Sequence, residues 1–222
     1  MSNNILITGA NRGIGLALTK KYQARGDVVY AVCRKASTEL LALKNVHVID
    51  DIDVTQDQDL ITLQGVLKNV TLNVLINNAG IMSEETLGDI NFSDVLQQFN
   101  VNAVGPLKTT QALLNNLKSG SKVAIITSRM GSISDNGSGG WYGYRMSKSA
   151  VNSAAVSLAQ DLKPQGISVV LLHPGFVQTD LVGQKGDISA SQSAGSLIQR
   201  ISELSLKNSG SLVHANGETL PW

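Results

Sequence analysis

The residues TGANRGIG at positions 8–15 directly follow a short apolar run, Asn4–Thr8. The run has the length and composition of a buried strand, and the stretch that follows it predicts a helix over about 14–25. Three glycines within 8–15 allow a sharp turn between the two elements. Such a turn lets backbone N–H groups approach a phosphate at the positive end of the helix. Tight turns also use glycine for steric reasons, so this segment alone suggests a dinucleotide site without establishing one.

Short apolar runs alternate with longer amphipathic stretches along the rest of the chain. Further strands are expected over 28–33, 46–50, 73–77, 122–128, 167–173 and 211–214. Further helices are expected over 38–44, within 53–68, and over 92–118, 143–162 and 190–206, the one over 92–118 with a possible adjustment near Gly105 and Pro106. Strands that are apolar on both faces and separated by helices predict a mostly parallel sheet covered on both sides. We therefore expect one α/β, doubly wound, Rossmann-type domain over residues 1–222, with about seven strands.

The composition excludes several classes of protein. With 42% hydrophobic and 16% charged residues in 222, the chain can bury a large core, and wholesale disorder is not expected. The formal net charge of +1 indicates neither a nucleic-acid partner nor a polybasic membrane segment. No apolar run is long enough to span a bilayer, no signal peptide is visible, and we assign no metal ligands. The one cysteine, Cys33, cannot form an internal disulfide, which favours a cytoplasmic location.

Tyr144 and Lys148 are four residues apart at the start of a predicted helix, so their side chains share one face. A phenol with the ordinary pKa near 10 is a poor acid or base at neutral pH. A nearby ammonium favours the phenolate and is expected to lower that pKa toward useful general acid–base chemistry. The same spacing can arise by chance, so its weight depends on the residues around it.

Three further polar positions could accompany this pair. Ser128 ends the strand predicted at 122–128, and ligands bind at the carboxyl ends of parallel strands. The sequence NNAG at 77–80 ends another strand, where it is either a simple turn or part of a site. Asn102 lies inside the long predicted helix, where asparagine is unfavourable, and this indicates either a function or a helix irregularity.

In chain order and approximate spacing these segments resemble the short-chain dehydrogenase/reductase family, over essentially the whole chain. The resemblance implies a nicotinamide dinucleotide cofactor and a small-molecule carbonyl or alcohol substrate. It implies a catalytic set of Ser128, Tyr144, Lys148 and Asn102, the last anchoring a water that relays protons. It implies cofactor contacts from Gly9, Asn11, Arg12, Gly13, Ile14, Gly15, Arg34, Asp53, Asn78, Ala79, Gly80, Tyr144, Lys148, Pro174, Gly175, Val177 and Thr179.

A narrower resemblance comes from SRMGSISDN at 128–136, GGWYGYRMSK at 139–148 and NGETLPW at 216–222. These segments resemble the sniffer and C-factor-like carbonyl reductases, which implies reduction of aldehydes, ketones or quinones. An alternative is a signalling protein that keeps the fold and the cofactor but has little turnover. The intact serine, tyrosine and lysine set favours the enzyme.

The expected cofactor is NADP(H). An enzyme that prefers NAD usually has an acidic residue at the end of the second strand, where it accepts from the ribose 2′-OH. Here Cys33 takes that position, Arg34 follows it, and Arg12 lies in the glycine turn. In the family, basic residues at these two places flank the 2′-phosphate, and arginine suits that group because its planar fork makes paired hydrogen bonds.

Some features depart from the family pattern. The interval from Ser128 to Tyr144 is longer than usual, and the DNGSGG loop at 135–140 could absorb the excess. Ser132 and Tyr142 remain weaker candidates for the serine and tyrosine roles. The segment after Pro174 is short, which predicts a small substrate lid. The helices at 92–118 and 143–162 resemble the pair that forms the family's dimer interface, so we expect a homodimer or homotetramer.

Overall fold

The computed structural model describes residues 2–222. Seven strands form one sheet in the order β3-β2-β1-β4-β5-β6-β9, and each neighbouring pair is parallel. The strands are β1 (Asn4–Thr8), β2 (Val28–Val32), β3 (Val46–Ile49), β4 (Leu72–Asn77), β5 (Leu117–Ile126), β6 (Ser168–His173) and β9 (Leu212–His214). A separate two-stranded sheet pairs β7 (Val177–Gln178) with β8 (Ile188–Ser189). The predicted doubly wound α/β architecture is confirmed.

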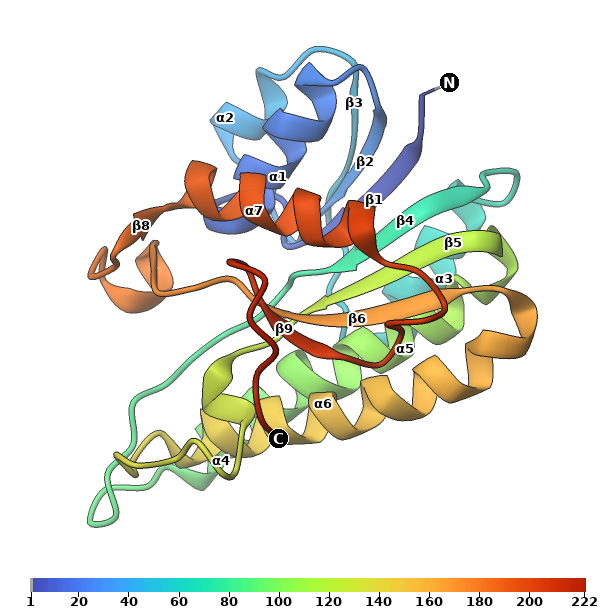
Figure 1. The fold of residues 1–222 in the computed structure, drawn as a ribbon. Coiled ribbons are helices and arrows are strands. Elements are labelled where there is room, and N and C mark those ends of the chain that lie inside the picture. The colour runs from blue at the N-terminus through green and yellow to red at the C-terminus, as the bar shows by residue number, and fades with distance from the viewer. Residues whose placement is uncertain (1) are drawn as a thin grey trace.

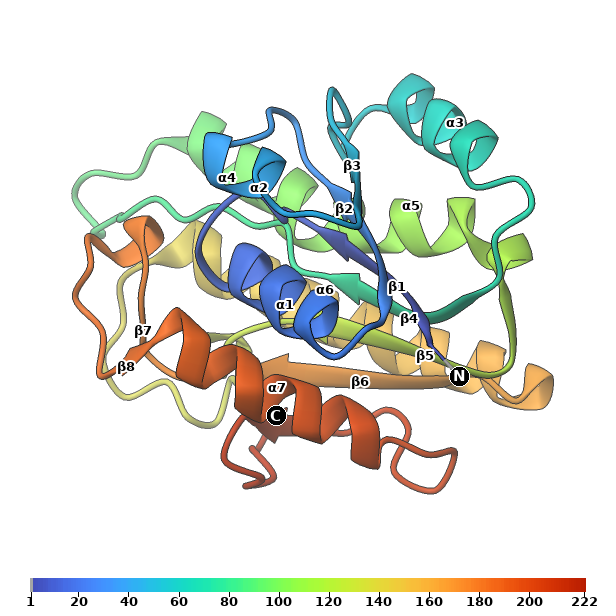
Figure 2. The same cartoon turned by 90° about the horizontal axis from the view of Figure 1, so that it is seen from above.

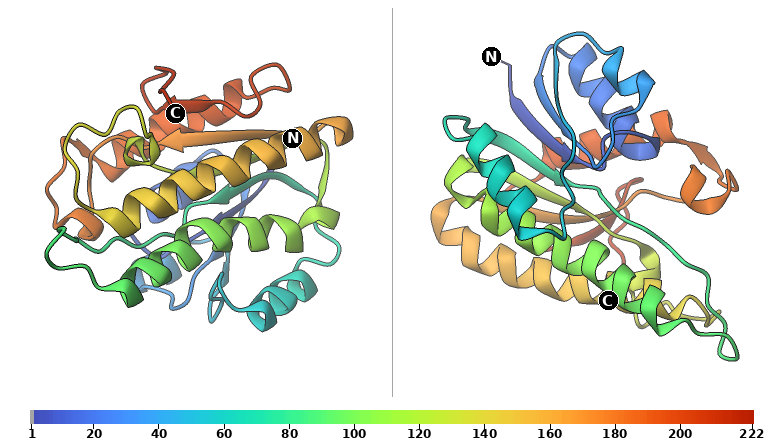
Figure 3. Two further views of the ribbon diagram at one scale, coloured as in Figure 1. Left: turned by 90° about the horizontal axis from the view of Figure 1, so that it is seen from below. Right: turned by 180° about the vertical axis from the view of Figure 1, so that it is seen from behind.

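Helices cover both faces of the sheet (Figures 1 and 2). They are α1 (Gly13–Ala24), α2 (Thr38–Leu41), α3 (Asp57–Val66), α4 (Phe92–Phe99), α5 (Gly105–Ala112), α6 (Tyr142–Leu162) and α7 (Ala190–Glu203). One face carries α1, α2 and α7, and the view from below shows α3, α5 and α6 across the other (Figure 3). Among residues 2–222, no helix combines the length and the apolar character that crossing a membrane requires.

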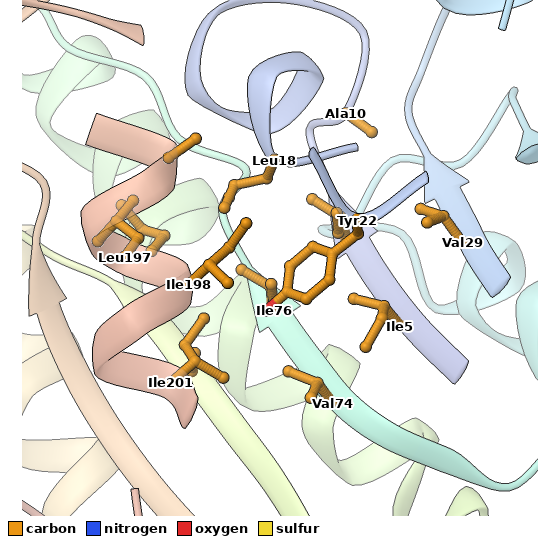
Figure 4. Close-up of a cluster of buried hydrophobic side chains, with 14 of the residues drawn as sticks. Ile5, Ala10, Leu18, Tyr22, Val29, Val74, Ile76, Leu197, Ile198 and Ile201 are labelled. Atoms are coloured by element: carbon orange, nitrogen blue, oxygen red, sulfur yellow. The ribbon is translucent and has the colours of Figure 1, made fainter. Parts of the chain in front are cut away.

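Two apolar clusters fill the space between the sheet and these two helix layers. Successive residues of a strand point to opposite faces, so Ile5 and Ile7 of β1 enter one cluster and Leu6 enters the other. Figure 4 shows the first cluster, where Leu18 of α1 and Ile198 of α7 pack over β1 and β4. This explains why the central parts of the strands are apolar on both faces, since neither face meets water there.

The helix predicted over 92–118 is interrupted, close to the expected adjustment at Gly105 and Pro106, and it ends before β5 begins at Leu117. The helix is α-helical only to Phe99, runs as a π-helix over Asn100–Val104, and resumes as α5. Pro106 lies in the first turn of α5 and has no N–H to donate to the carbonyl four residues earlier, so the regular hydrogen-bond pattern of the α-helix is interrupted there. A 3-10 turn over Leu114–Asn116 then leads into β5.

Strand β5 also differs from its prediction, because it begins at Leu117 and ends at Ile126 rather than spanning 122–128. Its first part pairs with β4 through an irregular register between Leu72 and Val74, which the apolar pattern does not mark. Ser128 therefore lies just beyond the strand, where it precedes a 3-10 turn over Arg129–Gly131. The other element boundaries differ from the predictions by a few residues.

Candidate active site

A cleft lies at the edge of the sheet where the carboxyl ends of β1, β2, β4 and β5 meet. The strand order reverses between β1 and β4, which is where open α/β sheets bind ligands. The predicted site residues that line the cleft are Gly9, Asn11, Arg12, Gly13, Ile14, Arg34, Asp53, Asn78, Ala79, Gly80, Tyr144, Lys148, Pro174 and Thr179. The structure thus brings together side chains from segments across most of the chain.

The glycine turn forms one end of this cleft and leaves no room for side chains. A Cβ on Gly15 would lie 2.2 Å from the Gly9 carbonyl oxygen, and Gly9 itself has φ +65°. The Asn78 amide nitrogen donates to the carbonyls of Thr8 (2.9 Å) and Gly9 (3.2 Å), so this side chain fixes the shape of the turn. Arg12 precedes α1 and provides no side-chain cap, which leaves backbone N–H groups at the helix start for a ligand. These features fit a dinucleotide pyrophosphate.

Two arginines also line the cleft: Arg12 in the glycine turn and Arg34 just after β2. Arg34 lies 3.9 Å from Asp53, and Arg12 lies 3.2 Å from Asp180. Both guanidinium groups are about two-thirds exposed, so these ion pairs are weak and can be exchanged for a phosphate. Cys33 follows β2 and is buried, so no carboxylate stands at the end of this strand.

Ser128, Tyr144 and Lys148 come together beside this cleft. The Lys148 ammonium donates to the Ile126 carbonyl (3.0 Å) at the end of β5, and it lies 5.6 Å from the centre of the Tyr144 ring. The Ser128 hydroxyl accepts from the Met130 N–H (3.1 Å), and all three side chains are buried. A buried lysine next to a phenol and a hydroxyl is an arrangement suited to proton transfer.

Burial decides the charge state of the pair. Desolvation raises the pKa of Tyr144 to about 12, and hydrogen bonding with the Ser128 side chain opposes this rise. Desolvation also lowers the pKa of Lys148 to about 8. The expected lowering of the Tyr144 pKa is therefore not found in this structure, because the phenolate loses its water on burial. Tyr144 keeps its proton at neutral pH and can act as an acid.

Asn102 lies within the π-helical segment and does not line the cleft. Its amide oxygen accepts from the Ile81 N–H (2.9 Å), and its amide nitrogen donates to the Ile81 carbonyl (2.8 Å) and to the Ser147 hydroxyl (3.0 Å). Ser147 in turn donates to the Tyr144 carbonyl (2.8 Å). The side chain therefore links the exit of β4 to the helix that carries Tyr144, and the helix irregularity that the sequence left open is present here.

The structure favours Ser128 and Tyr144 over the alternatives Ser132 and Tyr142. Tyr144 lines the cleft, while Tyr142, two residues earlier, does not. The Ser132 hydroxyl accepts from the Asp135 N–H (3.2 Å) inside its own loop, whereas Ser128 interacts with Tyr144.

Gly15, Gly175 and Val177 also lie outside the cleft lining. Gly15 instead allows the close approach within the glycine turn. Val177 is buried in β7, where it pairs with Ile188, and Gly175 has φ +90° next to the Ile188 side chain. These residues shape the walls of the cleft.

Several lining residues were missed by the sequence reasoning. They include Ile52, Val54, Ile81, Val101 and Asp180. The apolar ones carry no chemical signal that separates them from the core. Asp180 directly follows the predicted Thr179, so its place next to that residue could have suggested it.

Comparison with known proteins identifies the family. The family model described as short chain dehydrogenase matches residues 3–189. The 1-hydroxy-2-glutathionyl-2-methyl-3-butene dehydrogenase of Rhodococcus sp. (strain AD45) is 36% identical over 226 residues, which cover 99% of this chain and 100% of the relative. The C-signal protein of Myxococcus xanthus is 44% identical over 154 residues, which cover 68% of this chain and 93% of the relative.

Solved structures support the same family assignment. The carbonyl reductase Sniffer of D. melanogaster superposes with a TM-score of 0.90 at 34% identity, with both chains covered completely. The NADPH-bound carbonyl reductase from chicken fatty liver superposes with a TM-score of 0.89 at 29% identity, covering 100% of this chain and 99% of that one. The chain therefore belongs to the short-chain dehydrogenase/reductase family of oxidoreductases.

Proposed function

We propose that this protein is an NADPH-dependent carbonyl reductase that acts on aldehydes, ketones or quinones. The observation that carries the proposal is the buried grouping of Ser128, Tyr144 and Lys148, in which Tyr144 and Lys148 line the same cleft as the glycine turn. Similar solved structures support it, since two of them are carbonyl reductases and one of these holds NADPH. The Rhodococcus relative, by its name, acts on a hydroxyl compound, which supports chemistry at an alcohol or carbonyl carbon.

Each part of the cleft has a role in the proposed mechanism. Backbone N–H groups from Asn11 to Ile14 would hold the pyrophosphate, and Lys148 would hold the nicotinamide ribose. When bound, the cofactor supplies the hydride that reduces the carbonyl carbon. The Ser128 hydroxyl and the Tyr144 phenol bind the carbonyl oxygen. Tyr144 then gives its proton to the developing alkoxide, for which its protonated state at neutral pH is suited.

The first prediction concerns the acid. Replacing Tyr144 by Phe removes only the phenolic hydroxyl, so we expect kcat for carbonyl reduction to fall at least about a hundredfold, the scale of positioned acid catalysis. NADPH oxidation against a panel of aldehydes, diketones and quinones measures this, together with the Kd for NADPH, which should change little. Tyr142→Phe is the matched control and should keep its activity. Near-normal turnover in Tyr144→Phe would contradict the mechanism.

A second prediction follows from the buried charge of Lys148. Its pKa is about 8 in the folded protein, against the ordinary lysine value of 10.5, so the unfolded chain binds more protons between these two values. The buried ammonium therefore destabilises the fold fully below pH 8, and this penalty disappears as pH rises to 10.5. At about 1.4 kcal/mol per pKa unit the penalty is about 3 kcal/mol, and the hydrogen bond to Ile126 offsets about 1 kcal/mol of it.

We therefore expect Lys148→Met to be more stable than the wild type by about 2 kcal/mol at pH 7, with a difference that shrinks from pH 8 to 10.5. Urea unfolding of the cofactor-free protein at several pH values measures it. Lys163→Met, at an exposed position just after α6, is the control and should show no such pH dependence. A difference that is absent at pH 7, or independent of pH, would show that Lys148 is not a penalised buried charge.

A third prediction concerns the choice of cofactor. Charge-assisted contacts with a 2′-phosphate contribute about 1.5–3 kcal/mol each, which corresponds to a preference of tenfold or more per arginine. We expect kcat/KM to favour NADPH over NADH, and Arg34→Ala to lower that ratio about tenfold. Arg25→Ala, beyond the other end of α1, should leave the ratio unchanged. Equal efficiency with both cofactors in the wild type would overturn the assignment, and an unchanged ratio in Arg34→Ala would remove Arg34 from it.

The assembly is proposed to be a homodimer or a larger homo-oligomer that uses α4, α5 and α6. Phe92, Leu96 and Phe99 follow helical spacing on one side of α4 and are 72%, 65% and 41% exposed, and Leu107 of α5 is 41% exposed. The three helices lie on the same side of the molecule (Figure 3). Exposed apolar side chains gathered in this way are typical of a protein interface.

The fourth prediction tests that interface. A charge in the centre of an apolar contact is costly to bury, so we expect Leu96→Glu to dissociate the oligomer into monomers in sedimentation velocity at micromolar concentration. Leu41→Glu, at a similarly exposed position on α2, should leave the assembly intact. A wild-type protein that is already monomeric under these conditions would refute the proposed assembly.

A second candidate function is a cofactor-binding signalling protein with little turnover. The 44% identity with C-signal favours it. The same carbonyl panel discriminates the two candidates. Tight NADPH binding without reduction of any of these substrates would favour signalling.

A further inference from the structure

A buried carboxylate, Glu85, lies in the connection from β4 to α4 and is only 3% exposed. One of its oxygens accepts from the Gly143 N–H (3.1 Å), and the other accepts from the side-chain amide of Gln98 (2.6 Å). The Gln98 amide oxygen accepts from the Ser83 N–H (3.0 Å), and Gln98 is fully buried. Among residues 2–222 no cation forms an ion pair with Glu85. We call Glu85 and Gln98 the amide–carboxylate clamp.

The clamp completes the start of helix α6. The residue before this helix, Trp141, has a left-handed backbone (φ +49°) and gives no side-chain cap. The first N–H groups of a helix need acceptors from elsewhere. Glu85 supplies two of them, because its backbone carbonyl accepts from the Trp141 N–H (2.9 Å) and its carboxylate accepts from Gly143. The negative charge also lies at the positive end of the helix dipole.

The amide–carboxylate clamp packs tightly against the start of α6 at Gly143. A Cβ on Gly143 would lie 2.5 Å from the Gln98 amide nitrogen, 3.0 Å from the Glu85 carboxylate and 3.0 Å from the Val95 Cα. Tyr144 is the next residue. A shift of the clamp therefore moves the backbone that carries the phenol.

A second side-chain amide, Asn102, lies one turn after Gln98, in the π-helical segment that continues α4. Asn102 binds Ile81 and reaches α6 through Ser147, whereas Gln98 binds Ser83 and reaches α6 through Glu85. The segment 81–85 is thus fixed at both ends, and its first residue lines the cleft. Figures 1 and 3 show this connection beside the loop that leads into α6, at the end of the molecule that lies beyond the sheet.

We propose that the amide–carboxylate clamp is a positioning pair for the proposed carbonyl reduction, holding Tyr144 at the substrate through its ordered set of hydrogen bonds. This rests on the proposed function. Glu85 and Gln98 touch neither the cofactor cleft nor the phenol, so they act through the backbone of α6. Their loss should lower kcat and leave the affinity for NADPH unchanged.

The clamp can be tested by swapping its two side chains, because each hydrogen-bond donor in it has one acceptor. In Glu85→Gln, the new side chain has an NH₂ group in place of one carboxylate oxygen. That NH₂ group must face another N–H donor, because Gly143 donates to one of the two oxygens of Glu85 and Gln98 donates to the other. In Gln98→Glu, two carboxylates face each other at the place of the 2.6 Å contact. In the double variant all three hydrogen bonds can form again. The new amide at position 85 can donate to the new carboxylate at position 98 and accept from Gly143, while that carboxylate also accepts from Ser83.

The experiment measures kcat, KM for a carbonyl that the wild type reduces, and Kd for NADPH in both single variants and in the double variant. We expect each single variant to lose about tenfold or more in kcat with Kd for NADPH within about twofold, and the double variant to recover to within about threefold of the wild type. Glu84→Gln and Gln97→Glu make the same chemical changes at exposed neighbouring positions and should have no effect. Normal kcat in the single variants, or a double variant no better than the weaker single one, would overturn the proposal.

Hydrogen exchange separates this proposal from the proposed function. If the wild type reduces no carbonyl, the proposed function fails, and the clamp is judged by the backbone amides of residues 141–145. Exchange that is at least about tenfold faster in both single variants and restored in the double variant supports the clamp. Unchanged exchange in the single variants overturns it. If a single variant does not fold, the comparison of the double variant with the wild type decides in the same way.

Discussion

The contact between the glycine turn and the exit of β4 is the constraint on which the rest of the site depends. Gly15 lies so close to Gly9 that one methyl group would close the space, and the Asn78 amide ties the same turn to the neighbouring strand. Two chain segments about seventy residues apart are thereby held at van der Waals distance. The edge of the sheet can be open and polar there because the Asn78 amide satisfies the hydrogen-bonding needs of the backbone carbonyls of the turn. Every other residue of the cleft is positioned relative to this junction.

The proposed catalytic grouping of Ser128, Tyr144 and Lys148 shows how strongly burial affects the protonation of neighbouring side chains. Tyr144 and Lys148 lie one helical turn apart, yet desolvation moves their pKa values in opposite directions, to about 12 and about 8. The simple view of an ammonium activating a phenol neglects the water that both groups lose on folding. In the protein, the tyrosine is a proton donor by default, and the lysine carries a positive charge that the fold tolerates at a cost.

Much of the fold and of the site could be predicted from the sequence because the relevant signals are local. The glycine turn, the four-residue spacing of Tyr144 and Lys148, and the apolar strands each occupy a few consecutive residues. The sequence indicated an irregularity in the long helix near Asn102 and Pro106 but not its form, because the effect of a proline depends on whether the helix there widens, bends or ends. The partners of Asn102 and Glu85 could not be predicted, since each joins segments that only the sheet topology brings together. The pKa of Tyr144 likewise depends on burial, which no spacing reveals.

The two apolar clusters have a consequence for how such a protein can change over evolutionary time. Among residues 2–222, neither cluster draws any side chain from 78–102, 127–149 or 173–193, the segments that follow β4, β5 and β6 and supply many of the residues that line the cleft. Substitutions in these segments therefore leave the main hydrophobic contribution to folding unchanged. New binding preferences can accumulate there under separate selection, while the sheet and its helices keep the fold constant. One scaffold can in this way serve many small-molecule chemistries.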